Sequence, residues 1–161
     1  MTRPSHQPHW SRKSTAVWRL ALTPLLPLAL SAAPTVGAAE PAATLSVAFQ
    51  GIKTPSGAVM VALVDGKDAY EDKAPAARQA LAAVTGASVE VTFTGLKPGT
   101  YAIRAFHDLN GDGKLNTNPF GIPTEPYAFS NNARGATGPP PWDAAAFEVK
   151  AGANRQTIDI D

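Results

Sequence analysis

Several short segments of this chain alternate apolar side chains with polar or small ones, one residue at a time. Residues 45–49 place Leu, Val and Phe at every second position, and residues 89–93 place Val, Val and Phe in the same way. Side chains on a β-strand point alternately to opposite faces, so a period of two gathers the large side chains on one face. The core must then come from half-buried strands, and we expect it to include Val61, Val91, Phe93, Ile103 and Phe147.

Other stretches complete the predicted set of strands. Residues 58–64 are apolar at nearly every position, which is typical of a central strand, and Asp65-Gly66 follows with turn chemistry. Alternation resumes at residues 145–149 and 158–160, so the chain is expected to finish on a strand. Six or seven short strands separated by turn signals predict an all-β fold, an antiparallel sandwich.

Two connections in the middle of the chain have signatures of their own. Leu96-Lys97-Pro98-Gly99 predicts a type II turn, because Pro fixes φ near −65° and Gly accepts the positive φ that comes next. A hairpin would then pair residues 101–106 with the strand before them. Between the second and third strands we expect one short crossover helix, with Ala77, Leu81 and Val84 on one face, Asp72 as its N-cap and Gly86 after its end.

The first forty residues differ in composition from the rest. Four basic residues and no acidic one precede residue 20, an apolar run occupies residues 20–30, and small side chains surround Ala38. A run of this length is too short for a membrane span, which needs roughly 20 residues. We expect a cleaved signal peptide at residues 1–38 and a single β-sandwich domain at residues 39–161, exported to the periplasm or outside the cell. The alternatives are an uncleaved anchor and a disordered basic tail.

Removal of this leader changes the charge of the protein. The whole chain has 14 basic and 13 acidic residues, and loss of the four leader cations leaves a net charge of −3. A mildly acidic domain without a basic cluster excludes nucleic acid as the expected partner, and no second apolar stretch predicts a membrane span. The chain has no cysteine, which excludes disulfides and thiolate chemistry.

A long segment with few alternating apolar residues, residues 107–142, interrupts the strands and is rich in Asn, Gly and Pro. A central loop of this length in a compact domain is usually functional or disordered, and its large apolar side chains favour function. Its first part follows the first nine positions of an EF-hand loop, with oxygen-bearing groups at the spacing that Ca²⁺ requires. The predicted ligands are Asp108, Asn110, Asp112, the Lys114 carbonyl and Asn116.

The last position of that pattern departs from an EF-hand. Pro119 stands where a bidentate Glu is expected, so a further ligand would have to come from Asn118 or Glu125, or the site is weak. The alternative is an Asx-rich turn whose side chains bond its own backbone.

The same residues resemble a known family. The segments GLKPGTY (95–101), FHDLNGDGKL (106–115), GIPTE (121–125) and FSNNARG (129–135) are similar to the exported bacterial family called domain of unknown function 2141. The turn and the acidic loop are also similar, more loosely, to the prealbumin-like B repeats of bacterial surface adhesins. The second likeness implies a transthyretin-like β-sandwich, and the first implies export without an assigned activity.

A candidate ligand surface combines short polar side chains, one guanidinium and aromatic rings. Such groups suit a carboxylate or the hydroxyls of a sugar, although they equally suit a loop that satisfies its own backbone. The candidate residues are His107, Glu125, Tyr127, Ser130, Asn131, Asn132, Arg134 and Trp142.

Three functions follow from these observations. The first is an exported, non-catalytic envelope or secreted module, stabilised by Ca²⁺, that binds a carbohydrate or a protein. The second is a small-ligand carrier of transthyretin-like type. The third is an uncharacterised hydrolase with His107 as its base. Convergence of His107, Glu125 and Arg134 in one concave pocket would favour the carrier or the enzyme, and their dispersal would favour the module.

Overall fold

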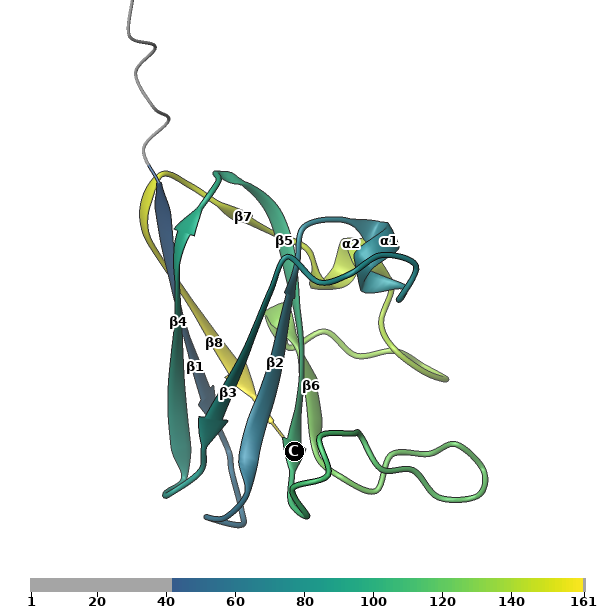
Figure 1. Ribbon diagram of the computed structural model, residues 1–161. Coiled ribbons are helices and arrows are strands. Elements are labelled where there is room, and N and C mark those ends of the chain that lie inside the picture. Colours follow the sequence, from purple (N-terminus) through teal and green to yellow (C-terminus); the bar gives the residue numbers. More distant parts are fainter. Residues whose placement is uncertain (1–41, 161) are drawn as a thin grey trace, which may run out of the picture. The chain divides into compact units, whose positions relative to one another are not determined.

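The computed structural model describes residues 42–160, so the predicted signal peptide, residues 1–38, lies outside the described residues. Within the described part the chain forms eight strands and three helices of one turn or less (Figure 1). They are β1 (Ala43–Gln50), β2 (Ala58–Val64), α1 (Lys67–Tyr70), β3 (Arg78–Ala83), β4 (Ser88–Leu96), β5 (Gly99–Asp108), β6 (Tyr127–Phe129), the 3₁₀ helix η1 (Ser130–Asn132), α2 (Trp142–Ala145), β7 (Phe147–Val149) and β8 (Gly152–Asp159). The predicted all-β fold class is confirmed, and none of the described helices is long and apolar enough to cross a membrane.

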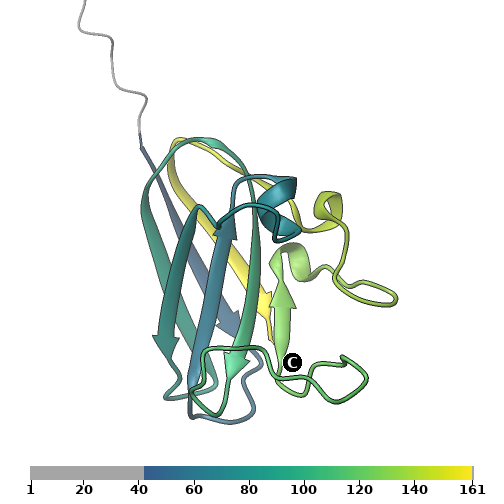
Figure 2. The ribbon, with the colours of Figure 1, turned by 45° about the vertical axis from the view of Figure 1, so that its right-hand side comes forward.

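The strands form two sheets. One has three strands in the order β4-β1-β8, and the other has five, in the order β3-β2-β5-β6 with β7 paired to β5. Figures 1 and 2 show the two sheets as separate layers. Most pairs are antiparallel, as expected, but β1 and β8 run parallel. The predicted central position of residues 58–64 is confirmed, because β2 lies between β3 and β5.

One hydrophobic core joins the two sheets. Leu45 and Phe49 of β1 and Ile158 of β8 are fully buried, and they belong to the same apolar cluster as Val59 and Ile103 of the five-stranded sheet. Burial of both inner faces against each other gives the domain a sandwich-like arrangement. Four of the five predicted core side chains are buried: Val61, Val91, Phe93 and Ile103. The fifth, Phe147, is half-buried and packs against the edge of this cluster.

The predicted hairpin after residue 94 is wrong. The strand β4 pairs with β1, whereas β5 pairs with β2, so the connection at Lys97 and Pro98 passes from one sheet to the other. Gly95, and not Gly99, adopts a positive φ, of 67°, which a type II turn centred on Pro98 does not explain. Local turn chemistry identified a reversal of the chain here but not the partner of each strand.

The predicted crossover helix is also wrong. Residues 78–83 form β3, which pairs antiparallel with β2 and places Leu81 opposite Met60. Alanine favours a helix, but intrinsic propensity is weak beside the backbone hydrogen bonds that an open sheet edge offers. Asp72, the predicted N-cap, follows the short helix α1 and has a positive φ of 58°.

A second, smaller apolar cluster covers part of the outer face of the five-stranded sheet. It joins Tyr70 of α1, Ala102 of β5, Phe129 of β6 and Ala145 of α2, with Trp142 packed against them. The short helices α1 and α2 contribute to this cluster, whereas η1 contacts β8 of the other sheet (Figure 2). The candidate site lies beside this cluster.

Candidate functional site

A row of apolar side chains crosses the outer face of the five-stranded sheet. Leu81 of β3 lies opposite Met60 of β2, Met60 lies opposite Phe106 of β5, and Phe106 lies opposite Tyr127 of β6. Residues directly opposite each other on neighbouring strands share a face. Leu81 is 63% exposed, so this row continues beyond the part of the sheet that the rest of the domain covers.

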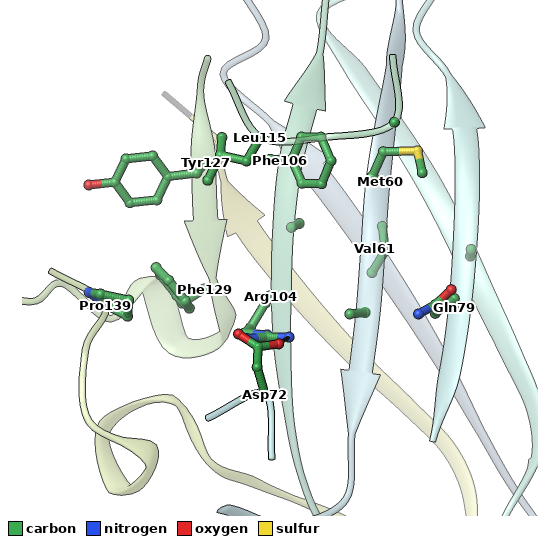
Figure 3. Close-up of a pocket in the computed structure, with 14 residues that line it drawn as sticks. Met60, Val61, Asp72, Gln79, Arg104, Phe106, Leu115, Tyr127, Phe129 and Pro139 are labelled. Atoms are coloured by element: carbon green, nitrogen blue, oxygen red, sulfur yellow. Dashed lines mark hydrogen bonds and ion pairs between the residues drawn. The ribbon is translucent and has the colours of Figure 1, made fainter. Parts of the chain in front are cut away.

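Most of this row lines a cavity of about 440 Å³. Met60, Phe106 and Tyr127 form its floor, and Leu115 of the central loop is seen between Tyr127 and Phe106 in the view of Figure 3. Pro139 lies at the other side of the cavity, beyond Phe129. The lining is completed by Val61, Ala62, Asp72, Gln79, Ala80, Arg104, Ala105 and Gly113. A mostly apolar concavity of this size with few polar groups is typical of a site for a small molecule.

The charged groups of this cavity are Arg104 and Asp72, which form an ion pair. The guanidinium donates two hydrogen bonds to the carboxylate of Asp72, at 2.8 and 2.5 Å, and a third to the backbone carbonyl of Tyr70, at 2.9 Å. These hydrogen bonds lower the pKa of Asp72 and raise that of Arg104. The pair stays fully charged near neutral pH, so the cavity holds one fixed cation and one fixed anion beside an apolar floor.

Three aromatic rings pack against one another beside Arg104. The ring of Tyr70 packs against Phe129 and, edge to face, against Trp142, with centroids 6.1 and 5.7 Å apart. The Tyr70 hydroxyl donates a hydrogen bond to the carbonyl of Pro140 at 2.9 Å. Burial raises the pKa of that hydroxyl from 10.0 to about 12. The chain around Tyr70 is therefore fixed, and with it the carbonyl that orients Arg104.

Of the predicted ligand residues, Tyr127 lines this cavity, whereas Trp142 lies at a smaller concavity next to it. Ser130 is fully buried, accepts a hydrogen bond from Ile103 N–H at 2.9 Å and donates one to the Ala145 carbonyl at 2.5 Å. Asn131 donates to the carbonyls of Ala144 and Ala146. The side-chain amide of Asn132 donates to the carboxylate of Asp159 and accepts a hydrogen bond from the backbone N–H of Asp159. The polar atoms of this segment tie η1 to α2 and to β8.

His107 and Glu125 are also used inside the domain. His107 is 1% exposed, and its Nε2 lies 2.7 Å from the carbonyl of Ser56. The neighbouring Gly57 has a φ of 73°, and a Cβ there would lie 2.2 Å from the carbonyl oxygen of Asp108, so only glycine fits. His107, Glu125 and Arg134 are all absent from the residues that line the cavity. The convergence of these three residues in the cavity, which would favour a carrier or a hydrolase, is not observed, so a carrier site would use the other residues that line the cavity.

The predicted calcium ligands lie together in the first part of the central loop. Asn110 Nδ2 lies 3.2 Å from Asp112 Oδ2 and 3.1 Å from Asn116 Oδ1, whereas Lys114 contributes its backbone N–H to Asp112. The two oxygens of Asp108 accept the N–H groups of Gly111 and Gly113, at 2.7 and 2.8 Å. This network of side-chain to backbone hydrogen bonds is that of an Asx-rich turn.

Glu125 closes this loop. Its carboxylate accepts the N–H of Leu109 on one oxygen and the N–H of Asn116 on the other, both at 2.9 Å. Within residues 42–160 no three His, Cys, Asp or Glu side chains cluster so that they could hold a metal ion. A cation in this loop would therefore depend on amide and carbonyl oxygens as well as on Asp108 and Asp112.

Sequence reasoning missed most of the cavity. The sequence patterns place Met60, Phe106 and Leu115 only on strands or in the loop, and they give Arg104 and Asp72 no role as ligand groups. Two signals were available: residues 58–64 are apolar on both faces, and Arg104 is the one charged side chain in residues 101–106. Neither signal says which of the two sheet faces lies open.

The chain matches a family described as uncharacterized proteins conserved in bacteria, DUF2141, over residues 47–157. It belongs to this family. The match covers β2 to β7 in full and β1 and β8 in part, and it includes the floor of the cavity and the acidic loop. No curated protein and no solved structure matches the chain.

Proposed function

We propose that this protein of the DUF2141 family is an exported, non-catalytic binding protein that holds a small, largely apolar molecule. The ligand lies between the outer face of the five-stranded sheet and the central loop. The single observation that carries this proposal is the cavity of about 440 Å³ over the row of Met60, Phe106 and Tyr127. Its apolar floor provides the free energy of binding, and its few polar groups orient the ligand.

A small-ligand carrier is favoured here over the carbohydrate- or protein-binding module and over the hydrolase. A sugar needs free hydrogen-bonding partners, but Ser130, Asn131 and Asn132 already bond other parts of the domain. A hydrolase needs an accessible base, but His107 is almost fully buried and its Nε2 contacts a backbone carbonyl. The sandwich would be of the prealbumin-like type, in which case the ligand lies on an outer sheet face rather than between the sheets.

Export of the domain remains part of the proposal. It rests on the basic start of the chain, the short apolar run at residues 20–30 and the small side chains near Ala38. An apolar molecule crosses an aqueous compartment only slowly without a carrier, because its transfer into water is unfavourable. A periplasmic or secreted binding protein for such a molecule would meet that need.

A calcium ion in the acidic loop is a second candidate function. The observation that favours it is the convergence of Asn110, Asp112 and Asn116, which the EF-hand spacing predicted. Gly113 and Leu115 of the same loop line the cavity, so an ion there would hold one wall of the ligand site. The Asx-rich turn without an ion is the alternative.

An uncharged fluorescent probe, N-phenyl-1-naphthylamine, tests the proposed function. Ala62 faces the cavity from β2, between Gln79 and Arg104 on the neighbouring strands, so Ala62→Phe would fill the site. We expect the wild-type protein to bind the probe saturably and Ala62→Phe to weaken binding at least about tenfold, since burial of an aromatic side chain provides more than that factor.

The matched control is Ala48→Phe. Ala48 is a half-buried alanine on β1, the central strand of the other sheet, and its side chain points away from the core, as does that of Ala62. Ala48→Phe should leave probe binding unchanged. Absence of saturable binding in the wild-type protein, or equal weakening by both substitutions, would refute a ligand site in this cavity.

A further inference from the structure

We infer that the ligand is an amphiphile with a carboxylate group, and that this carboxylate binds the guanidinium of Arg104 in place of Asp72. The inference rests on the proposed function, because it names the chemistry of the molecule that occupies the same cavity. An apolar chain would lie over the row of Met60, Phe106 and Tyr127.

Among the described residues, 42–160, Arg104 is the one cation that lines the cavity. Its side chain is 28% exposed, and the carbonyl of Tyr70 holds one guanidinium nitrogen at 2.9 Å. The planar guanidinium is thus oriented by the protein before any ligand arrives, with its fork directed toward a carboxylate. Such a fork binds a carboxylate through two parallel hydrogen bonds, and it does so with more specificity than a lysine.

Asp72 occupies this fork in a way that permits exchange. Its side chain is 75% exposed, and it belongs to the turn that follows α1, outside any strand. Its backbone φ of 58° lies in the left-handed region, which non-glycine residues adopt rarely. After release from Arg104 the carboxylate would enter water without a large rearrangement. Exposed ion pairs contribute little stability, so exchange of one carboxylate for another is close to balanced.

The apolar floor then decides the exchange in favour of the ligand. Arg104 and Phe106 are two residues apart on β5, so their side chains share the outer face and lie about 7 Å apart along the strand. From Phe106 the apolar row extends across β2 to Leu81 on β3, and neighbouring strands are about 4.8 Å apart. A carboxylate on Arg104 therefore places a medium-length chain directly over this row, where its burial is favourable.

Decanoate, decanol and decylamine distinguish this inference from simple apolar binding, because they share one chain and differ in the head group. Their affinities are measured by displacement of N-phenyl-1-naphthylamine from the wild-type protein and from three variants, Arg104→Gln, Arg104→Lys and Asp72→Asn. Asparagine tolerates the left-handed backbone of residue 72, so Asp72→Asn removes the competing charge and retains the turn. Thermal melts confirm that each variant is folded.

We expect Asp72→Asn to tighten decanoate binding by up to about fivefold, which is the range of an exposed ion pair. Arg104→Gln should weaken decanoate binding by about tenfold or more, and Arg104→Lys should give an intermediate affinity, because it keeps the charge and loses the fork. Decanol should change little among the variants that keep the apolar floor. Decylamine should bind more weakly than decanol to the wild-type protein.

The outcomes separate this inference from the proposal on which it rests. If none of the three molecules displaces the probe, and the probe itself does not bind, the proposed function fails. If decanol and decanoate bind equally and Asp72→Asn has no effect on decanoate, the ligand site stands and the carboxylate inference is overturned. Tighter binding of decylamine than of decanoate would overturn it too, since Asp72 would then be the group that recognises the ligand.

Discussion

Replacement of Ser130 by alanine should destabilise the domain without changing its ligand affinity. Ser130 begins η1 and is fully buried, and its hydroxyl links two segments that no backbone ladder joins at this point. It accepts the N–H of Ile103 in β5 and donates to the carbonyl of Ala145 in α2. The sequence suggested this residue as a ligand group, so the substitution tests whether it is structural instead.

The magnitude follows from the two groups that lose their partner. Each buried backbone donor or acceptor without a hydrogen bond costs about 1–3 kcal/mol. Loss of both partners therefore lowers the free energy of unfolding by about 2–6 kcal/mol, a large part of the 5–15 kcal/mol typical of a domain. The matched control is Ser46→Ala, because Ser46 on β1 makes an exposed hydrogen bond to Thr92 and its loss should cost less than about 0.5 kcal/mol.

Urea unfolding, followed by circular dichroism, measures both variants against the wild-type protein. The denaturation midpoint of Ser130→Ala should fall, while the slope of the transition stays the same. Titration with N-phenyl-1-naphthylamine under native conditions should give the wild-type affinity. A change of less than about 1 kcal/mol together with lost probe binding would mean that the hydroxyl serves the ligand rather than the fold.

Four further predictions concern the core, the aromatic cluster, the acidic loop and the leader. Phe93→Ala should destabilise the domain by about 3–5 kcal/mol in urea unfolding, whereas Phe120→Ala, at a side chain that is 88% exposed, should change stability by less than about 0.5 kcal/mol; equal losses would contradict the assignment of the inner face. Because the pKa of Tyr70 is raised from 10.0 to about 12, the contribution of this hydroxyl to stability is complete below pH 10 and is lost as the pH rises toward 12. An ultraviolet titration of tyrosinate should therefore show a late step near pH 12 that Tyr70→Phe removes, and an unchanged curve would refute the shift. If the acidic loop binds Ca²⁺ with a dissociation constant of about 10⁻⁴–10⁻³ M, calcium at ten times that concentration should stabilise the fold by about 1.4 kcal/mol, and magnesium should stabilise it less. Asp108→Ala combined with Asp112→Ala should abolish the effect of calcium. Thermal melts that do not respond to millimolar calcium would leave only the Asx-rich turn. Mass spectrometry of the exported protein should find an N-terminus close to the predicted cleavage site, and recovery of the intact chain would refute the signal peptide.

The inner faces of the two sheets were predictable because their pattern is local. Alternation along residues 45–49 identifies β1, and the same rule identifies β4 and the end of β8. Each of these strands needs only its own side chains to specify which face is buried. The class of fold and most of the core follow from that rule alone.

Strand pairing was not predictable in the same way, because it is decided by segments far apart in the chain. The Pro98 turn marks a reversal, but whether β5 returns beside β4 or joins the other sheet depends on which edge is free. The same holds for β3, whose alanines favour a helix until β2 offers an unpaired edge. The cavity depends on both pairings, since β3, β2, β5 and β6 together form its floor.

The acidic loop shows a different limit. Asn110, Asp112 and Asn116 lie together in this loop, but the oxygens of such a cluster can bond a cation or the backbone of the loop. Glu125 illustrates this ambiguity, because it was considered as a further ligand and instead accepts two backbone N–H groups. A pattern of oxygen-bearing residues gives the position of such a loop but not the species that it binds.

The outer face of the five-stranded sheet is the main reason to propose a ligand for this domain. An antiparallel sheet with one face on the core commonly presents polar side chains on the other, whereas here Leu81, Met60, Phe106 and Tyr127 cross that face in one row. Apolar groups at these positions do not strengthen the main core, which lies on the opposite side of the sheet. The central loop covers only part of the row, and it does so through a single large side chain, Leu115, which is itself 37% exposed. A row kept apolar, partly covered and flanked by an oriented guanidinium has the composition that the proposed site for an amphiphile requires.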